Sequence, residues 1–151
     1  MLLSHLVFVT GLIVTGLLMN TLLSVIHSDV RFVGSGLWIL LGIAFFLHRF
    51  GAMHIQVYLT TNHIISHIAD GVSGLIIVLC TLVLIRPIDI YAVPVGMIIG
   101  YAAFYCWYAA VHSYRSMGVN FLRFERYSSF LPAILLIIYS ILMAILMPGR
   151  S

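Results

Sequence analysis

Long apolar runs alternate with short polar stretches along the whole chain. Strongly apolar segments cover residues 2–26, 33–47, 68–85, 92–112 and 130–147. A helix needs about 20 mostly apolar residues to cross a bilayer, and the backbone groups of a segment in lipid must pair with one another. The pattern predicts an all-α fold. We expect a polytopic integral membrane bundle of about five transmembrane helices, with four as the alternative, in a single domain over residues 1–151.

The second apolar segment is the shortest of the five. Its core, GLWILLGIAFFL, is too short for a full crossing, which leaves open whether it spans the membrane. We expect its helix to continue through the polar sequence HRFGAMHI, or the segment to be shielded by other protein. The third and fourth segments are joined by RPIDIY, where Pro87 favours a turn.

Composition places the chain in a membrane and limits its partners. Of its residues 63% are hydrophobic and 7% are charged, whereas about a quarter of the residues of a soluble domain are charged. The net charge of +3 comes from seven arginines against four acidic residues. No polar segment is long enough to form a water-soluble basic module, so we expect no nucleic acid. The expected partners are membrane lipids and other transmembrane helices or subunits.

The longest polar connection, HSYRSMGVNFLRFERYSS, interleaves aromatic residues with arginines. This pattern is typical of a segment that lies in the headgroup region, with its aromatic side inward and its arginines toward phosphate. A loop that binds a protein partner would have the same pattern.

The distribution of arginine predicts the orientation of the bundle. The face that holds the N-terminus carries Arg49, Arg115, Arg123 and Arg126, and the opposite face carries Arg31, Arg86 and Arg150. Because basic residues collect on the cytoplasmic side of membrane proteins, four against three favours a cytoplasmic N-terminus.

Six of the seven histidines fall toward one membrane face in this layout. Four of them lie in HRFGAMHIQVYLTTNHIISHIADG, which ends the second segment and leads into the third. The six are His5, His48, His54, His63, His67 and His112, and His27 lies at the other face. These histidines are either the polar boundary of one face or a single site assembled there.

A metal site is one hypothesis for this face. His63, His67 and Asp70 have the spacing H-x3-H-x2-D, which places them within an arc of about 60° on a helix. Two imidazoles and a carboxylate can supply three ligands to a divalent metal such as zinc or iron. The glutamate of an H-E-x-x-H motif is missing, so a zinc protease has no general base in the expected place.

Haem b is the alternative cofactor. Two axial histidines must approach haem from opposite faces and usually come from different helices, so His63 and His67 would compete. The candidate haem ligands are therefore His48, His67 and His112.

A boundary role without any cofactor is the third interpretation of the histidines. Histidine is a tolerable amphipathic residue where a helix leaves the membrane. Asp70 would then cap the first amides of the third span and meet the positive end of its helix dipole.

A stripe of small residues marks the fourth segment. Ala92, Gly96 and Gly100 are spaced by four, which lets a second helix approach closely. The sequence leaves open whether that helix belongs to this chain or to another subunit. Further along, Tyr105, Trp107 and Tyr108 predict an aromatic belt at the membrane interface.

Three functions are compatible with these features. The first is a non-enzymatic packing or assembly subunit of a larger membrane complex, or a homo-oligomer formed through the glycine stripe. The second is a redox subunit that binds haem b or a metal through the one-sided histidine cluster. The third is a small pore-forming or lysis protein of the holin type. An enzyme would have to build its site almost wholly from the histidine face, so the balance leans against one.

Overall fold

The computed structural model describes residues 1–30, 32–118 and 120–146, and this part of the chain is all-helical. The helices follow one another with short links, which confirms the predicted fold class. They are α1 (Leu2–Val25), α2 (Ser35–Leu59), α3 (Ser66–Ile88), the 3₁₀ turn η1 (Asp89–Tyr91), α4 (Ala92–Gly100), the π-helical segment η2 (Tyr101–Tyr105), α5 (Cys106–Met117), α6 (Phe121–Ser128) and α7 (Phe130–Leu146).

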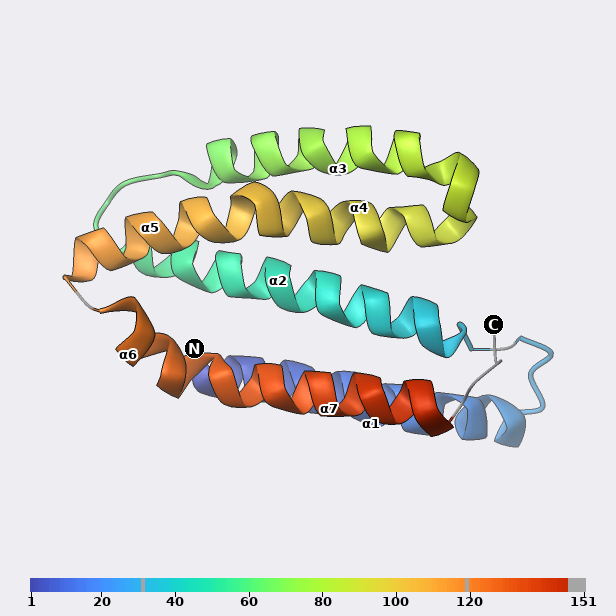
Figure 1. Cartoon of the computed structure of the whole chain (residues 1–151). Helices are drawn as coiled ribbons and strands as arrows, with labels where there is room; N and C mark the ends of the chain where they lie inside the picture. The colour runs from blue at the N-terminus through green and yellow to red at the C-terminus, as the bar shows by residue number, and fades with distance from the viewer. Residues whose placement is uncertain (31, 119, 147–151) are drawn as a thin grey trace.

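Three helical segments are long and apolar enough to cross a membrane, or four if α6 and α7 count as one span bent by 55°. The third segment, Ser66–Met117, turns back at η1, and Figure 1 shows α3 and α4 as its two antiparallel arms. The chain is therefore an integral membrane helical bundle. The predicted last span, residues 130–147, matches α7 as far as Leu146, and Met147 lies outside the described residues.

The second segment reaches the length of a full crossing. Helix α2 contains 25 residues, which corresponds to about 37 Å at 1.5 Å per residue. It gains this length by running through HRFGAMHI, as the short apolar core required.

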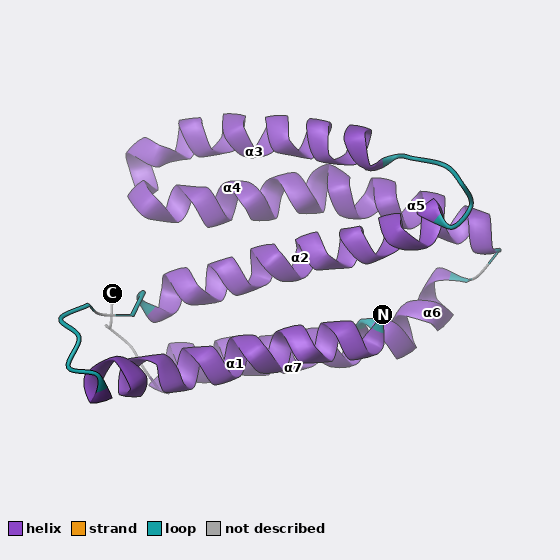
Figure 2. Cartoon of the chain, turned by 180° about the vertical axis from the view of Figure 1, so that it is seen from behind, coloured by secondary structure: helices purple, strands orange, loops and turns teal. Residues whose placement is uncertain are grey.

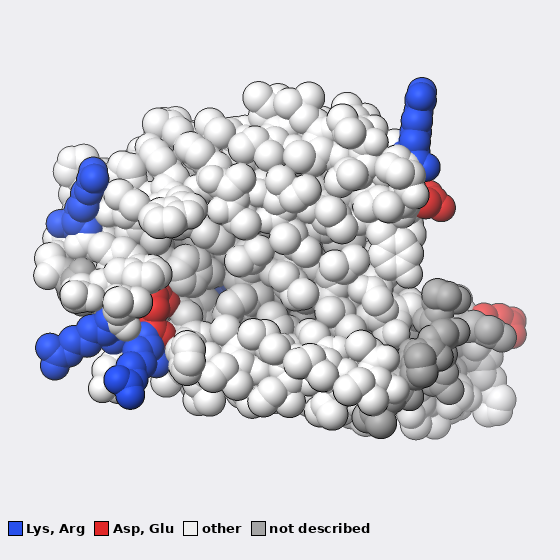
Figure 3. Space-filling model, viewed as in Figure 1, with Lys and Arg blue, Asp and Glu red and all other residues white. Residues whose placement is uncertain are grey.

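The helices form two adjoining layers with a common long axis (Figures 1 and 2). Helices α3, α4 with α5, and α2 make one layer, and α1 and α7 make the other. The N-terminus, the α2–α3 link and the α5–α6 link lie together at one end of the bundle, which we call the N-terminal end. On the face seen in Figure 3 most charged side chains gather at the two ends, and the surface between them is largely uncharged.

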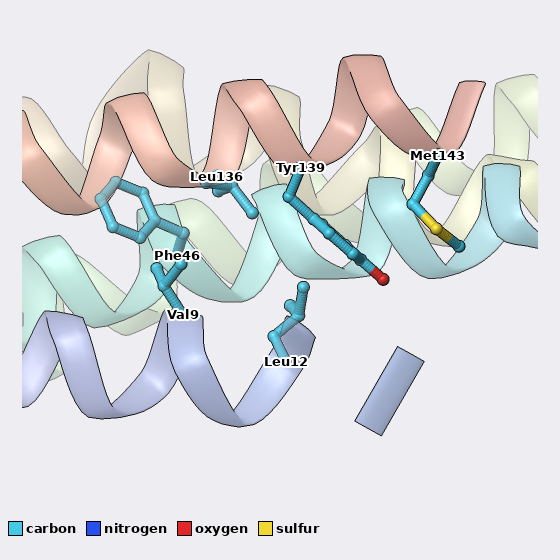
Figure 4. Close-up of a cluster of buried hydrophobic side chains, with 6 residues drawn as sticks. All are labelled: Val9, Leu12, Phe46, Leu136, Tyr139 and Met143. Atoms are coloured by element: carbon cyan, nitrogen blue, oxygen red, sulfur yellow. The ribbon is translucent and has the colours of Figure 1, made fainter. Parts of the chain in front are cut away.

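The two layers meet in a hydrophobic core. Buried side chains from three helices form it, namely Val9, Leu12, Phe46, Leu136, Tyr139 and Met143. Figure 4 shows Tyr139 reaching from α7 toward α1. It needs the space left by Gly16, because a Cβ atom at this position would collide with the Tyr139 hydroxyl and lie 2.6 Å from Nε1 of Trp38.

The small-residue stripe of α4 packs against α3 of the same chain. Ala92 is fully buried. A Cβ atom on Gly96 would lie 3.1 Å from the carbonyl oxygen of Ile77, and one on Gly100 would lie 2.9 Å from that of Ser73. The stripe thus brings the two backbones of the hairpin together, and its partner helix lies within the chain.

The predicted aromatic belt is wrong for Tyr105, which is buried against α2. Its ring occupies the space beside Gly51, where a Cβ atom would lie 2.6 Å from Cε1 of the ring. The side chain of Trp107, two residues on, is 70% exposed. Tyr105 and Trp107 therefore face opposite ways, and the inward ring of Tyr105 joins η2 to α2.

Candidate functional site

A cluster of polar side chains, two of them buried and three half-buried, lies at the N-terminal end where four helices meet; we call it the buried cluster after its two buried histidines. Its members are His5 of α1, Arg49 and His54 of α2, Tyr114 of α5 and Glu125 of α6. His5 is fully buried and His54 is 1% exposed. A buried polar group is costly unless it is hydrogen-bonded, so the partners of each residue decide what the cluster can do.

The connection between α5 and α6 carries Glu125 into the cluster. Helix α5 ends at Gly118, whose φ of 62° is left-handed, a conformation that glycine adopts without steric cost. Asn120 then caps α6, where its side-chain oxygen accepts the N–H of Leu122 at 3.1 Å. The eight residues of α6 are amphipathic, and they turn Glu125 inward while the arginines of this helix remain exposed.

The carboxylate of Glu125 accepts hydrogen bonds from three side chains. Nε2 of His54 lies 3.0 Å from Oε1, and the Tyr114 hydroxyl donates to the same oxygen. The Ser128 hydroxyl donates to Oε2 at 3.1 Å. Glu125 therefore ties α6 to α2 and α5, and its oxygens are occupied by donors from this chain.

The charge of Glu125 decides which nitrogen of His54 carries a proton. Helix α6 is a boundary helix outside the apolar spans. Burial alone would raise the pKa of Glu125, but its hydrogen bonds, that from His54 first among them, outweigh burial and lower the pKa to about 2. An ionised carboxylate only accepts hydrogen bonds, so Nε2 of His54 carries the proton in this pair.

Three imidazole nitrogens in the cluster have no hydrogen-bond partner among the described residues. They are both ring nitrogens of His5 and Nδ1 of His54. The nearby Arg49 instead bonds α1, since its Nε donates to the Ser4 carbonyl at 3.2 Å and its guanidinium also donates to the Ser4 hydroxyl. The open imidazole positions could hold a water or exchange a proton, because buried polar atoms of this kind commonly bind water.

Aromatic rings pack against both buried imidazoles. The ring of His5 lies 5.4 Å from that of Phe46, and the ring of His54 lies 4.6 Å from that of Phe50. The two phenyl rings belong to α2. They form the apolar wall on one side of the cluster.

The predicted metal ligands lie away from this cluster. His63, His67 and Asp70 are exposed, and Nδ1 of His63 donates to the Thr61 carbonyl at 2.9 Å. Within residues 1–30, 32–118 and 120–146, no group of three or more histidine, cysteine, aspartate or glutamate side chains is arranged to hold a metal ion. Metal binding by these three residues stays a prediction from the sequence.

The capping role expected of Asp70 is wrong. Helix α3 begins at Ser66 and its N-cap is Ile65, without a side-chain cap. Asp70 therefore lies in the second turn, deeper in the helix than a capping residue, and its side chain is exposed.

The three candidate haem ligands have different neighbours. The ring of His48 stacks on Tyr105 at 5.3 Å, whereas the ring of His112 lies 4.4 Å from Tyr108. Nδ1 of His112 donates to the Tyr108 carbonyl at 2.8 Å. His67 is exposed on α3. Haem binding by His48, His67 and His112 also stays a prediction.

Sequence reasoning placed His5 and His54 at the correct end but missed their polar neighbours. Glu125 is the only glutamate of the chain and stands between two exposed arginines in FLRFERYS. Its inward direction could have been read from the helical periodicity of that segment, combined with the predicted meeting of residues 48–67 and 112–129 at one face. No family model, curated protein or solved structure matches this chain.

Proposed function

We propose that the protein is a non-enzymatic membrane subunit that assembles with transmembrane helices of other chains, and that the outer face of α3 is the surface they bind. The observation that carries this proposal is a notch on α3, formed by the uncovered glycines Gly71 and Gly74 beside two ionisable side chains; Gly11 of α1 is equally uncovered but has no ionisable residue within four positions. A Cβ atom built on Gly71 or Gly74 has no other atom within 4 Å. The glycines of α4, by contrast, are closely covered by α3.

Polar side chains lie beside the notch: His67 is exposed, and the Asp70 carboxylate is at the edge of the same surface, next to Tyr105 of η2. His67, Asp70, Gly71 and Gly74 fall within an arc of about 100° on α3. His67 and Asp70 are exposed. An ionisable side chain that faces lipid is costly, and a small-residue notch lets a second helix come close enough to cover it. A transmembrane helix with polar groups at the same depth is therefore the expected occupant.

The buried cluster has a structural role in this proposal. Donors from α2, α5 and α6 itself fill the oxygens of Glu125. A carboxylate satisfied in this way holds helices together and has little capacity left for a substrate. This supports the boundary interpretation of the histidines and a subunit without catalysis.

The test is to close the notch. We expect the wild-type chain, purified from its native membrane in mild detergent, to carry a companion chain or a second copy. With the double variant Gly71→Leu, Gly74→Leu, the amount of co-purified companion chain should fall at least several-fold, because leucine would hold the partner backbone away. Gly11→Leu on α1 is the matched control, since a Cβ atom at Gly11 also has no neighbour within 4 Å. A lone wild-type chain, or retention by the double variant, would contradict the proposal.

The same preparation separates the other two functions. A redox subunit would show a haem absorbance band or bound metal that is lost on substitution of His67. A pore of the holin type would leak dye from vesicles. The pore hypothesis relied on oligomerisation through the stripe of Ala92, Gly96 and Gly100. Helix α3 of the same chain already covers the two glycines of that stripe.

For localisation we propose the cell membrane with a cytoplasmic N-terminus. The N-terminal end carries Arg49, Arg115, Arg123 and Arg126, and Arg86 lies at the other end; Arg31 and Arg150 lie outside the described residues. An N-terminal tag should be labelled by a membrane-impermeant reagent only after permeabilisation. Labelling of intact cells would reverse the orientation.

A further inference from the structure

A large apolar cavity opens between the two layers beside the buried cluster. Its volume is about 750 Å³, and residues of α2, α5, α6 and α7 line it. Phe46, Phe50 and Phe130 contribute to its apolar wall, and Glu125 and Arg126 stand at its polar edge. Figure 3 shows the surface hollowed between the layers, next to acidic atoms at the N-terminal end.

The size and lining of this cavity suit an alkyl chain. Sites for small molecules measure about 300–1,000 Å³, and the volume falls in this range. The cavity extends from α6, at the membrane boundary, to Phe46 and Ala133 within the spanning helices. In a bilayer, a cavity at this depth lies next to lipid acyl chains. These chains are therefore the apolar groups available to fill it.

The charge at the edge selects the headgroup. Glu125 directs its carboxylate to His54, Tyr114 and Ser128, so its charge is already compensated. Arg126 is exposed and forms no ion pair with any described residue. The uncompensated charge beside the cavity is therefore positive, and a guanidinium binds phosphate oxygens with two parallel hydrogen bonds. A phospholipid without a cation in its headgroup is favoured, because the quaternary ammonium of phosphatidylcholine would add a second positive charge at this edge.

We propose that this cavity binds one anionic phospholipid, with its phosphodiester on Arg126 and one acyl chain between Phe46 and Phe130. The chain would contact Phe46 and Phe50, the same rings that pack on His5 and His54. Bound lipid therefore supports the buried cluster from its apolar side. The site lies on the opposite part of the molecule from the α3 notch and does not depend on it.

The test measures lipid binding to the delipidated full chain in detergent by native mass spectrometry. The probes are dioleoyl phosphatidylglycerol, dioleoyl phosphatidylcholine and glycerol 3-phosphate. We expect one phosphatidylglycerol molecule to bind per chain and phosphatidylcholine to bind with about tenfold lower affinity. Glycerol 3-phosphate should not bind, because it has no acyl chain. Arg126→Gln should lower the affinity for phosphatidylglycerol about tenfold, which is the loss expected when one charge-assisted contact is removed.

Arg123→Gln is the matched control for the headgroup. Arg123 is exposed on the same helix but lines a separate hollow with Met1 and Tyr127. It should leave phosphatidylglycerol binding unchanged. Ala133→Leu narrows the apolar part of the cavity and should weaken the binding of both lipids. Arg126→Gln should weaken mainly the binding of the anionic lipid. Melting of each lipid-free variant checks that it is folded.

Three results would overturn the proposal. Equal binding of both lipids would remove the headgroup preference. Equal effects of Arg126→Gln and Arg123→Gln would assign the binding to the diffuse charge of α6. Binding of glycerol 3-phosphate as tight as that of the lipid would mean a phosphate site without a chain pocket. None of these results bears on assembly through α3.

Discussion

At the scale of single residues, the hydrogen bond between His54 and Glu125 joins helices that are distant in the chain. The two residues are 71 positions apart; His54 is buried and Glu125 is half-buried. Removing one partner from a buried pair leaves the other without compensation, which costs more than the pair itself contributes. The effect of a substitution should therefore depend on what it leaves unpaired.

We expect Glu125→Gln to destabilise the folded chain by about 3 kcal/mol, because His54 loses its charged acceptor. Tyr114→Phe should cost about 1 kcal/mol, the usual value of one hydrogen bond. Asp29→Asn is the control, since Asp29 is exposed. Thermal unfolding in detergent measures all three. A Glu125→Gln effect no larger than that of Asp29→Asn would show that the pair does not stabilise the bundle.

Acid should remove the contribution of Glu125. Its folded pKa of about 2 lies below the ordinary value of 4.5, so its stabilisation is complete above about pH 4.5 and is lost as the pH falls toward 2. The difference in melting temperature between wild type and Glu125→Gln should therefore shrink as the pH falls from 6 to 3. A constant difference over this range would mean that Glu125 titrates normally or is not ionised.

At the scale of elements, close helix contacts depend on glycines that face large side chains. Gly16 makes room for Tyr139 and Trp38, and Gly51 makes room for Tyr105. The sequence predicted the apolar runs well, because the length and hydropathy of a span depend on local composition. It could not show which glycines face a ring, because that depends on the rotation of each helix about its axis.

Gly16→Ala and Gly51→Ala should each destabilise the chain by about 1–3 kcal/mol through overpacking. Gly11→Ala makes the same chemical change and shares helix α1 with Gly16, but its Cβ atom would have no neighbour within 4 Å. It should be neutral or stabilising by up to about 1 kcal/mol through helix propensity. Chemical unfolding in detergent gives the three values. Three equal effects would show that ring contacts at Gly16 and Gly51 are not tight.

At the scale of the whole molecule, the two layers meet in a packed core, with a cavity beside it and uncovered glycines on α3. The sequence predicted that six histidines share one end, because an alternating path through the membrane follows from the order of the spans. It did not predict the contact of His54 with Glu125, the cavity, or the notch on α3. These features arise where helices distant in the chain meet, and spacing within one segment does not report such contacts.

The proposed assembly through α3 is tested most directly by crosslinking in the native membrane. A photoreactive residue at Leu75, which is 61% exposed one turn after Gly71, should give one discrete adduct with a partner chain or a second copy. The same residue at Leu18 on α1, which is 57% exposed, should give no protein adduct because that face meets lipid. A missing adduct at Leu75, or equal adducts at both positions, would contradict assembly through α3.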